Sequence, residues 1–201
     1  MRIEDNILKG EGGDIKFVGS PNHSDGMSPL YLVLHYTAGS SLDGAVSWLT
    51  NPKAKASAHL VIGRGGEVVQ LVRFDKKAWH AGVSLWGKLK NMNNFSIGIE
   101  LVNQGKLVRK GGKWVDYSDR VVADSDVIEA VHKNERYPAG WQTYTQKQVD
   151  QAIDVAKVLH EKFNFQDILG HEDIAPDRKV DPGPAFNLNR FRSLILGRMD
   201  E

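Results

Sequence analysis

The feature that most constrains this fold is an amphipathic helix predicted over residues 145–163. Thr145 and Gln148 have the three-residue spacing of a capping box at its start. Its apolar residues recur every three or four positions, as on a helix with one buried face: Val149, Ala152, Ile153, Ala156, Leu159 and Phe163. Because such a face must be covered, the rest of the chain has to supply a sheet or another helix.

Short strand-like segments provide the sheet. Residues 31–36 (YLVLHY) form a compact apolar run that is typical of a buried strand. Residues 58–72 are predicted to form a β-hairpin. In residues 96–102, isoleucine and leucine alternate with smaller or polar residues, so a strand there directs Glu100 away from the isoleucine face.

Further helices are predicted over residues 41–50 and near the C-terminus, where Asn189 is the expected N-cap. Strands interleaved with helices indicate an α/β fold with a central mixed β-sheet flanked by helices. Residues 103–141 are polar and mixed in charge, and loops of that length usually serve as lids or are disordered. We therefore expect residues 1–201 to form a single domain with a variable excursion at about 103–141.

Charge and composition exclude several classes of protein. The 26 basic and 25 acidic residues leave a net charge of +1, so the chain has no overall field for nucleic acid or an anionic membrane. The absence of cysteine excludes disulfides, thiolate metal ligands and a cysteine nucleophile.

No run of about 18 apolar residues predicts a membrane span. The first ten residues also lack the apolar stretch of a signal peptide. These features favour a soluble protein, either cytoplasmic or exported after removal of a signal peptide.

Three residues suggest a metal site. His35 ends the first predicted core strand, His171 follows Gly170 at the end of another, and Asp181 precedes a proline-rich loop. Taken singly, each fits an ordinary structural role, such as an Asp-Pro turn. Two histidines and one carboxylate that meet at one edge of a sheet would form the ligand set of a catalytic zinc site with an open fourth position.

Two further residues have the chemistry to act beside such a metal. Glu100 is a candidate general base that would take a proton from water and pass it to a leaving amine. Lys179 lies two residues before Asp181 and would face the same side in an extended segment, where it would stabilise an oxyanion. The alternative is that both are solvated surface residues.

Several stretches of the chain resemble a known family, the zinc-dependent N-acetylmuramoyl-L-alanine amidases of type 2. This family shares the fold of the peptidoglycan-recognition proteins, and the similarity is closest to its AmpD-type members and their relatives. The similarity covers residues 31–102 and 145–193. The stretches that carry it are LHYTA from Leu34, SAHLVI from Ser57, FDKKAWHAG from Phe74, NFSIGIE from Asn94 and GHEDIAPDRKVDPGP from Gly170.

The resemblance implies a role for each candidate residue. It implies that His35, His171 and Asp181 bind zinc. It also implies that Glu100 is the catalytic base and that Lys179 is the basic residue beside the site. The expected reaction is attack of a zinc-bound water on the lactyl carbonyl that joins muramic acid to L-alanine.

The resemblance also implies a substrate-binding face. Trp79 is expected to pack against sugar or peptide, and Asn94 and Arg178 to contact the muramyl group. Lys55 is expected to provide a cation for a carboxylate of the stem peptide. Tyr36 stands where the recycling enzymes have a polar amide, so a strict preference for anhydro-muropeptides does not follow.

The expected substrate is therefore peptidoglycan or an (anhydro)muropeptide, and the sequence indicates no protein partner. For such an enzyme we expect a cytoplasmic location, or a phage-encoded lysin that reaches the cell wall, or a trimmed exported enzyme. Two alternatives remain at this stage. One is a module that binds peptidoglycan without hydrolysing it, and the other is a zinc amidase that acts on a different acyl-amino substrate.

Overall fold

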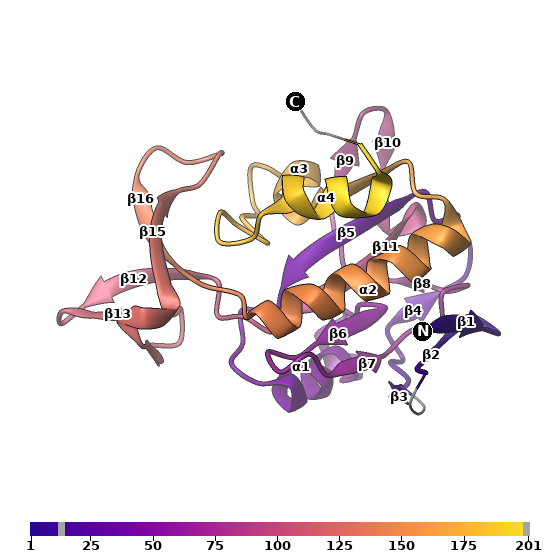
Figure 1. Ribbon diagram of the computed structural model, residues 1–201, viewed down its shortest axis with the longest axis horizontal. Coiled ribbons are helices and arrows are strands. Elements are labelled where there is room, and N and C mark those ends of the chain that lie inside the picture. Colours follow the sequence, from indigo (N-terminus) through magenta and orange to yellow (C-terminus); the bar gives the residue numbers. More distant parts are fainter. Residues whose placement is uncertain (12–14, 199–201) are drawn as a thin grey trace.

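The computed structural model describes residues 1–11 and 15–198, and its centre is a mixed β-sheet (Figure 1). The strand order is β17-β5-β11-β6-β7-β3, in which β7 runs antiparallel to β6 and the other neighbours are parallel. The bounds are β3 Lys16–Phe17, β5 Tyr31–Tyr36, β6 Leu60–Ile62, β7 Val68–Gln70, β11 Ser96–Leu101 and β17 Asp167–Gly170.

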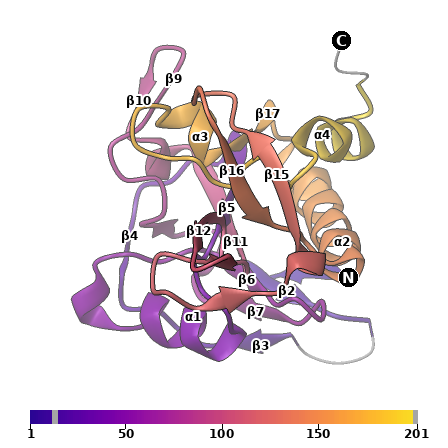
Figure 2. The same cartoon turned by 90° about the vertical axis from the view of Figure 1, so that its left-hand side faces the viewer.

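Helices cover both faces of this sheet, which confirms the predicted α/β fold. The helices are α1 (Leu42–Leu49), α2 (Gln146–Phe163), α3 (His171–Ile174) and α4 (Leu188–Leu196). Figure 2 shows α2 and α4 together on one side, with α1 away from them. The main core joins α2 and α4 to the sheet, whereas Leu49 of α1 and Ile174 of α3 belong to smaller clusters on its other side.

The ends of the helices refine the sequence interpretation. The side chain of Thr145 caps α2 by accepting from the backbone N–H of Gln148, as predicted. The side chain of Gln148, however, is buried and donates to the carbonyls of Ile62 and Val102, so the capping box is only half formed. Satisfying two carbonyls at the sheet outweighs the reciprocal cap contact.

The other predicted helix over residues 41–50 forms as α1, with Ser41 as its N-cap. The C-terminal helix begins earlier than expected. Its N-cap is Asn187, whose side chain accepts from the N–H of Arg190, so the assignment of Asn189 as the cap was wrong. Both asparagines precede Phe191 and Ile195 of the buried face, and sequence spacing did not distinguish them.

Strand alternation determines which side chains face the functional side of the sheet. Leu34 of β5 and Ile99 of β11 point into the core beneath α2. His35 and Glu100 therefore point to the opposite face. They are also register partners on adjacent strands, so the two side chains lie next to each other.

The excursion folds into a second, antiparallel sheet, so the expectation of a loop or lid over residues 103–141 was wrong. Its strand order is β14-β13-β12-β16-β15, and it extends away from the core (Figure 1). A small cluster of Leu107, Trp114 and Val122 holds it together. Other apolar side chains of these strands, such as Val108, Val121 and Val131, are exposed, so the sequence shows no regular alternation of buried and exposed positions. The bounds are β12 Lys106–Lys110, β13 Lys113–Val115, β14 Val121–Val122, β15 Val127–Val131 and β16 Pro138–Gln142.

Short elements complete the described chain. Three two-stranded pairs join β1 to β2, β4 to β8 and β9 to β10. Within residues 1–11 and 15–198, no helix has the length and apolar character needed to cross a bilayer. The remaining bounds are β1 Arg2–Glu4, β2 Ile7–Lys9, β4 His23–Ser24, β8 Lys77–Ala78, β9 Leu85–Trp86 and β10 Leu89–Lys90, with 3-10 helices at Pro52–Ala54, Met92–Asn94 and Asp124–Asp126.

Candidate metal centre and active site

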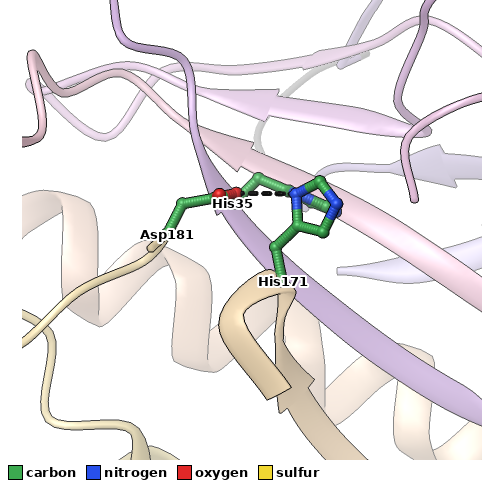
Figure 3. Close-up of side chains that lie close together, drawn as sticks. All are labelled: His35, His171 and Asp181. Atoms are coloured by element: carbon green, nitrogen blue, oxygen red, sulfur yellow. Dashed lines mark hydrogen bonds and ion pairs between the residues drawn. The ribbon is translucent and has the colours of Figure 1, made fainter. Parts of the chain in front are cut away.

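The three residues predicted as metal ligands meet at one point, although they are far apart in the sequence. His35 lies near the end of β5, His171 begins α3 directly after β17, and Asp181 lies in the loop that follows (Figure 3). Because β5 and β17 are parallel neighbours, their carboxyl ends lie at the same edge of the sheet. All three side chains are buried.

His35, His171 and Asp181, called the trio below, have the geometry of an open metal site. The Nδ1 atoms of His35 and His171 are 2.9 Å apart, and each lies 3.0 Å from Oδ2 of Asp181. Tetrahedral ligands at zinc distances would lie about 3.3 Å apart, so a small expansion suffices. These three side chains could hold a metal ion together.

The protons at the trio also favour a cation. Nε2 of His171 lies 3.1 Å from the carbonyl oxygen of Ala81, which can only accept. It also lies 3.3 Å from Nη2 of Arg178, but both protons of that nitrogen already point to the carbonyls of Ala81 and Val83, so Nε2 of His171 carries the ring proton. Nδ1 of His171 therefore presents a lone pair toward the carboxylate of Asp181. Two acceptors at that distance repel unless a positive charge lies between them. The residues fit a divalent metal with nitrogen and oxygen ligands, the donor set that zinc takes in catalytic sites.

Backbone contacts hold the two ligand-bearing segments together. The N–H of Glu172 donates to the carbonyl of Asp181 at 2.9 Å, and the N–H of Gly183 donates to Oε2 of Glu172 at 3.1 Å. A Cβ atom at Gly170 would lie 2.8 Å from Pro182. The close approach of the loop to β17 thus requires glycine at position 170.

Residues of the excursion also contact the segment that carries His171. Nε2 of His132 lies 2.7 Å from Oε2 of Glu172, and Nζ of Lys133 lies 2.9 Å from Oε1. The side chains of His132 and Glu172 are both buried. The amide of Asn134 also donates to the backbone carbonyl of Glu172. Glu172 thus links the excursion to both segments that carry the metal ligands.

We expect His132→Ala to lower the free energy of unfolding by about 1–3 kcal/mol, because it leaves a buried carboxylate short of a partner. A urea titration of the metal-free protein measures this change. Lys110→Ala is the matched control on the same excursion, since the Lys110–Asp119 pair is exposed and should contribute under about 1 kcal/mol. Equal losses in the two variants would contradict the bracing role of His132.

Glu100 lies beside the trio and has the properties of a base. Its side chain lines the cavity described below, but its Oε2 atom is buried and has no hydrogen-bond partner among the described residues. Burial raises the pKa of Glu100 to about 8, and the charge of Asp181 adds to this rise while Lys179 opposes it. A carboxylate in this setting accepts a proton readily near neutral pH.

A cavity of about 700 Å³ opens over Glu100 and the trio. Four of the other predicted site residues line it: Tyr36, Trp79, Arg178 and Lys179. Asn94 and Lys55 are not among the described residues that line it, and the side chain of Asn94 accepts a hydrogen bond from Lys77. The contacts that were predicted between substrate and these two residues stay predictions.

The sequence did not reveal how the excursion contributes to the cavity. Tyr117 and Arg120 of the excursion also line the cavity. Arg120 donates to Asp116, to Oγ of Ser40 and to the carbonyl of Ala38, which attaches the excursion to the loop before α1. A single Tyr and a single Arg in a charged segment form no sequence pattern that would have predicted their position at the cavity.

Sequence comparison identifies the class of protein. Residues 25–184 match the N-acetylmuramoyl-L-alanine amidase family. The chain belongs to this family, and the predicted resemblance is confirmed. The chain is accordingly an amide-hydrolysing enzyme of the amidase class.

Two curated members of the family are similar to this chain. The chain is 35% identical to the 1,6-anhydro-N-acetylmuramyl-L-alanine amidase AmpD of Escherichia coli K12, over 89% of this chain and 90% of the relative. It is also 29% identical to the N-acetylmuramoyl-L-alanine amidase AmiD of the same strain, over 83% of this chain and 53% of that relative.

Solved structures agree with this placement. A crystal structure of AmpD superposes with a TM-score of 0.66 at 29% identity and covers 97% of this chain and 99% of its own. AmiD from E. coli, in complex with anhydro-N-acetylmuramic acid-L-Ala-D-gamma-Glu-L-Lys, gives a TM-score of 0.60 at 27% identity, covering 86% of this chain and 57% of its own. The peptidoglycan-recognition-protein-like amidase fold is confirmed.

Proposed function

We propose that this protein hydrolyses the amide bond between the lactyl group of N-acetylmuramic acid and L-alanine, with one zinc ion held by His35, His171 and Asp181. The observation that carries the proposal is the convergence of three buried ligand atoms, 2.9–3.0 Å apart, beside an unpartnered buried carboxylate oxygen. A module that only binds peptidoglycan has no need of a base beside a metal site.

The side chains around the cavity divide the reaction between them. Zinc, when bound, supplies Lewis-acid polarisation of the carbonyl and lowers the pKa of water. Glu100 accepts the proton of the attacking water and delivers it to the departing amine of L-alanine. Lys179 lines the same cavity, and its ammonium group would stabilise the negative charge that develops on the carbonyl oxygen.

Other lining residues would orient the substrate. We assign Trp79 and Tyr36 to packing against it, since both line the cavity and are only partly buried. The guanidinium of Arg178 already donates to the carbonyls of Ala81 and Val83. One role of Arg178 would be to hold the loop that contains Ala81, whose carbonyl oxygen accepts from His171. The other would be to add positive charge near the muramyl group.

The activity should depend on pH through Glu100. A base works only when ionised, so kcat/KM should fall as the pH drops through its pKa. In the metal-free protein this pKa is raised from 4.5 to about 8, and a bound dication lowers it again. We therefore expect an acid limb between pH 4.5 and 8 in a pH–rate profile. A rate that increases toward low pH would contradict the assignment.

A digest of muropeptides resolved by mass tests the proposed reaction. Hydrolysis at the proposed bond gives a muramyl product with a free lactyl carboxylate and a stem peptide with a free L-alanine amino terminus. Binding without either product would support the non-hydrolytic alternative. Zinc binding with no cleavage of any muropeptide would support an amidase for another acyl-amino substrate.

The preferred form of the substrate and the compartment are also proposals. AmpD is named for a 1,6-anhydro substrate and AmiD was solved with an anhydro-muropeptide, so we propose a soluble anhydro-muropeptide as substrate. Of the locations expected from the sequence, we propose the cytoplasm, where a soluble muropeptide of this kind would be hydrolysed. Faster hydrolysis of intact sacculi than of anhydro-muropeptide would contradict this preference. We further propose that residues 1–201 act as one catalytic domain, since the excursion contacts the ligand-bearing segments.

A further inference from the structure

A fourth histidine lies directly behind the proposed metal site. Nδ1 of His80 is 2.9 Å from Nε2 of His35, on the side of the His35 ring that faces away from His171 and Asp181. His80 is buried, and its ring meets that of His35 edge to face. Neither the family resemblance nor the proposed reaction gives this residue a role.

The partners of His80 determine which of its nitrogens carries the proton. Its Nε2 faces the carbonyl oxygen of Ser96 at 3.3 Å and the hydroxyl oxygen of Ser96 at 3.4 Å. That hydroxyl donates its own proton to the carbonyl of Met92 at 2.6 Å. Both neighbours of Nε2 are therefore acceptors, so the proton of the neutral His80 ring resides on Nε2.

The consequence reaches the proposed metal ligand. Because the proton of His80 is on Nε2, the Nδ1 atom of His80 carries a lone pair and accepts a hydrogen bond from Nε2–H of His35. A neutral His35 with its proton on Nε2 presents a lone pair at Nδ1, the atom that faces His171 and Asp181.

The strand next to His35 has a shape that admits the His80 ring. A Cβ atom at Gly98 would lie 2.5 Å from Cγ of His80. Gly98 lies on β11 two residues before Glu100, and both point to the functional face of the sheet. The absence of a side chain at position 98 leaves the space that the imidazole fills.

From this geometry we infer that His80 is a positioning residue, which fixes the tautomer and ring orientation of His35 so that its Nδ1 is ready to bind a metal ion. The inference rests on the proposed metal site. Partners of this kind, outside the ligands themselves, typically change metal affinity by about 10–100-fold when removed.

Zinc titration of the metal-stripped full chain, with a competing chelator, tests the inference. His80→Leu retains the bulk but has no acceptor, and should weaken the dissociation constant for zinc about 10–100-fold. His80→Asn places an amide oxygen where Nδ1 stood, and should restore the constant to within about threefold of the original. In ¹⁵N spectra of the metal-free protein, His35 should carry its proton on Nε2, and His80→Leu should shift it toward a mixture of tautomers.

His59 provides the matched control. It is a buried histidine whose ring lies 5.9 Å from that of His80, and it accepts from the N–H of Gly98 without contacting the trio. His59→Leu should lower stability yet leave the zinc constant unchanged. Equal constants for His80→Leu and the unaltered protein, or a proton on Nδ1 of His35, would overturn the inference. If the unaltered protein itself fails to bind zinc, the proposed function fails instead.

Discussion

Replacing Glu100 by Gln is expected to lower kcat about 10²–10⁴-fold while zinc binding is retained. The amide keeps the size of the side chain but cannot accept the proton of the attacking water. Initial rates on a muropeptide, together with the zinc content of the purified variant, measure both effects. Glu161→Gln is the control, because Glu161 is exposed on α2 and is not among the residues that line the cavity. A near-normal rate for Glu100→Gln would reject Glu100 as the base.

The same substitution should stabilise the metal-free protein. The pKa of Glu100 is about 8 in the folded chain and near 4.5 in the unfolded chain, so between these values the folded state binds the additional proton. The free energy of unfolding therefore falls as the pH increases across this window, by up to about 5 kcal/mol in total. Glu100→Gln removes this loss of unfolding free energy. At pH 8 the variant should therefore have a higher urea midpoint than the original protein, whereas at pH 4 the two midpoints should be the same. Equal midpoints at pH 8 would contradict the buried, unpartnered state of the carboxylate.

Removing a proposed ligand should have the largest effect on metal binding. His171→Ala is expected to weaken zinc binding at least about 10²-fold, since a zinc site worth about 10–16 kcal/mol over four ligands loses roughly 3 kcal/mol with one of them. Turnover should fall below detection. Equilibrium dialysis followed by elemental analysis measures the bound zinc.

A histidine on the surface serves as the comparison for this loss. His23 lies exposed on β4, so His23→Ala should bind one equivalent of zinc and hydrolyse substrate normally. Stoichiometric zinc in His171→Ala would show that the metal binds elsewhere.

The central sheet and the position of the site could be predicted because simple periodicities govern them. Alternation along residues 96–102 directed Glu100 away from the isoleucines, and the structure places it on the face opposite α2. The strand ends at His35 and His171 meet because β5 and β17 are parallel neighbours. The roles of these residues, in contrast, came from the family resemblance.

Other features depend on contacts that leave no local pattern. Gln148 has the position of a capping residue, but its amide serves the carbonyls of two strands that lie far away in the sequence. The role of His80 depends on the ring of His35, 45 residues earlier. The excursion has the composition of a loop, and only its pairing shows that it is a sheet that holds Glu172. Tertiary contacts decide all three cases.

Anomalous X-ray scattering at the zinc edge, from crystals of the zinc-loaded protein, tests the central claim most directly. We expect a peak about 2.0–2.2 Å from Nδ1 of His35, Nδ1 of His171 and a carboxylate oxygen of Asp181. A peak at other residues, such as His132 and Glu172, or no peak near these three atoms, would contradict the proposed site and the mechanism built around it.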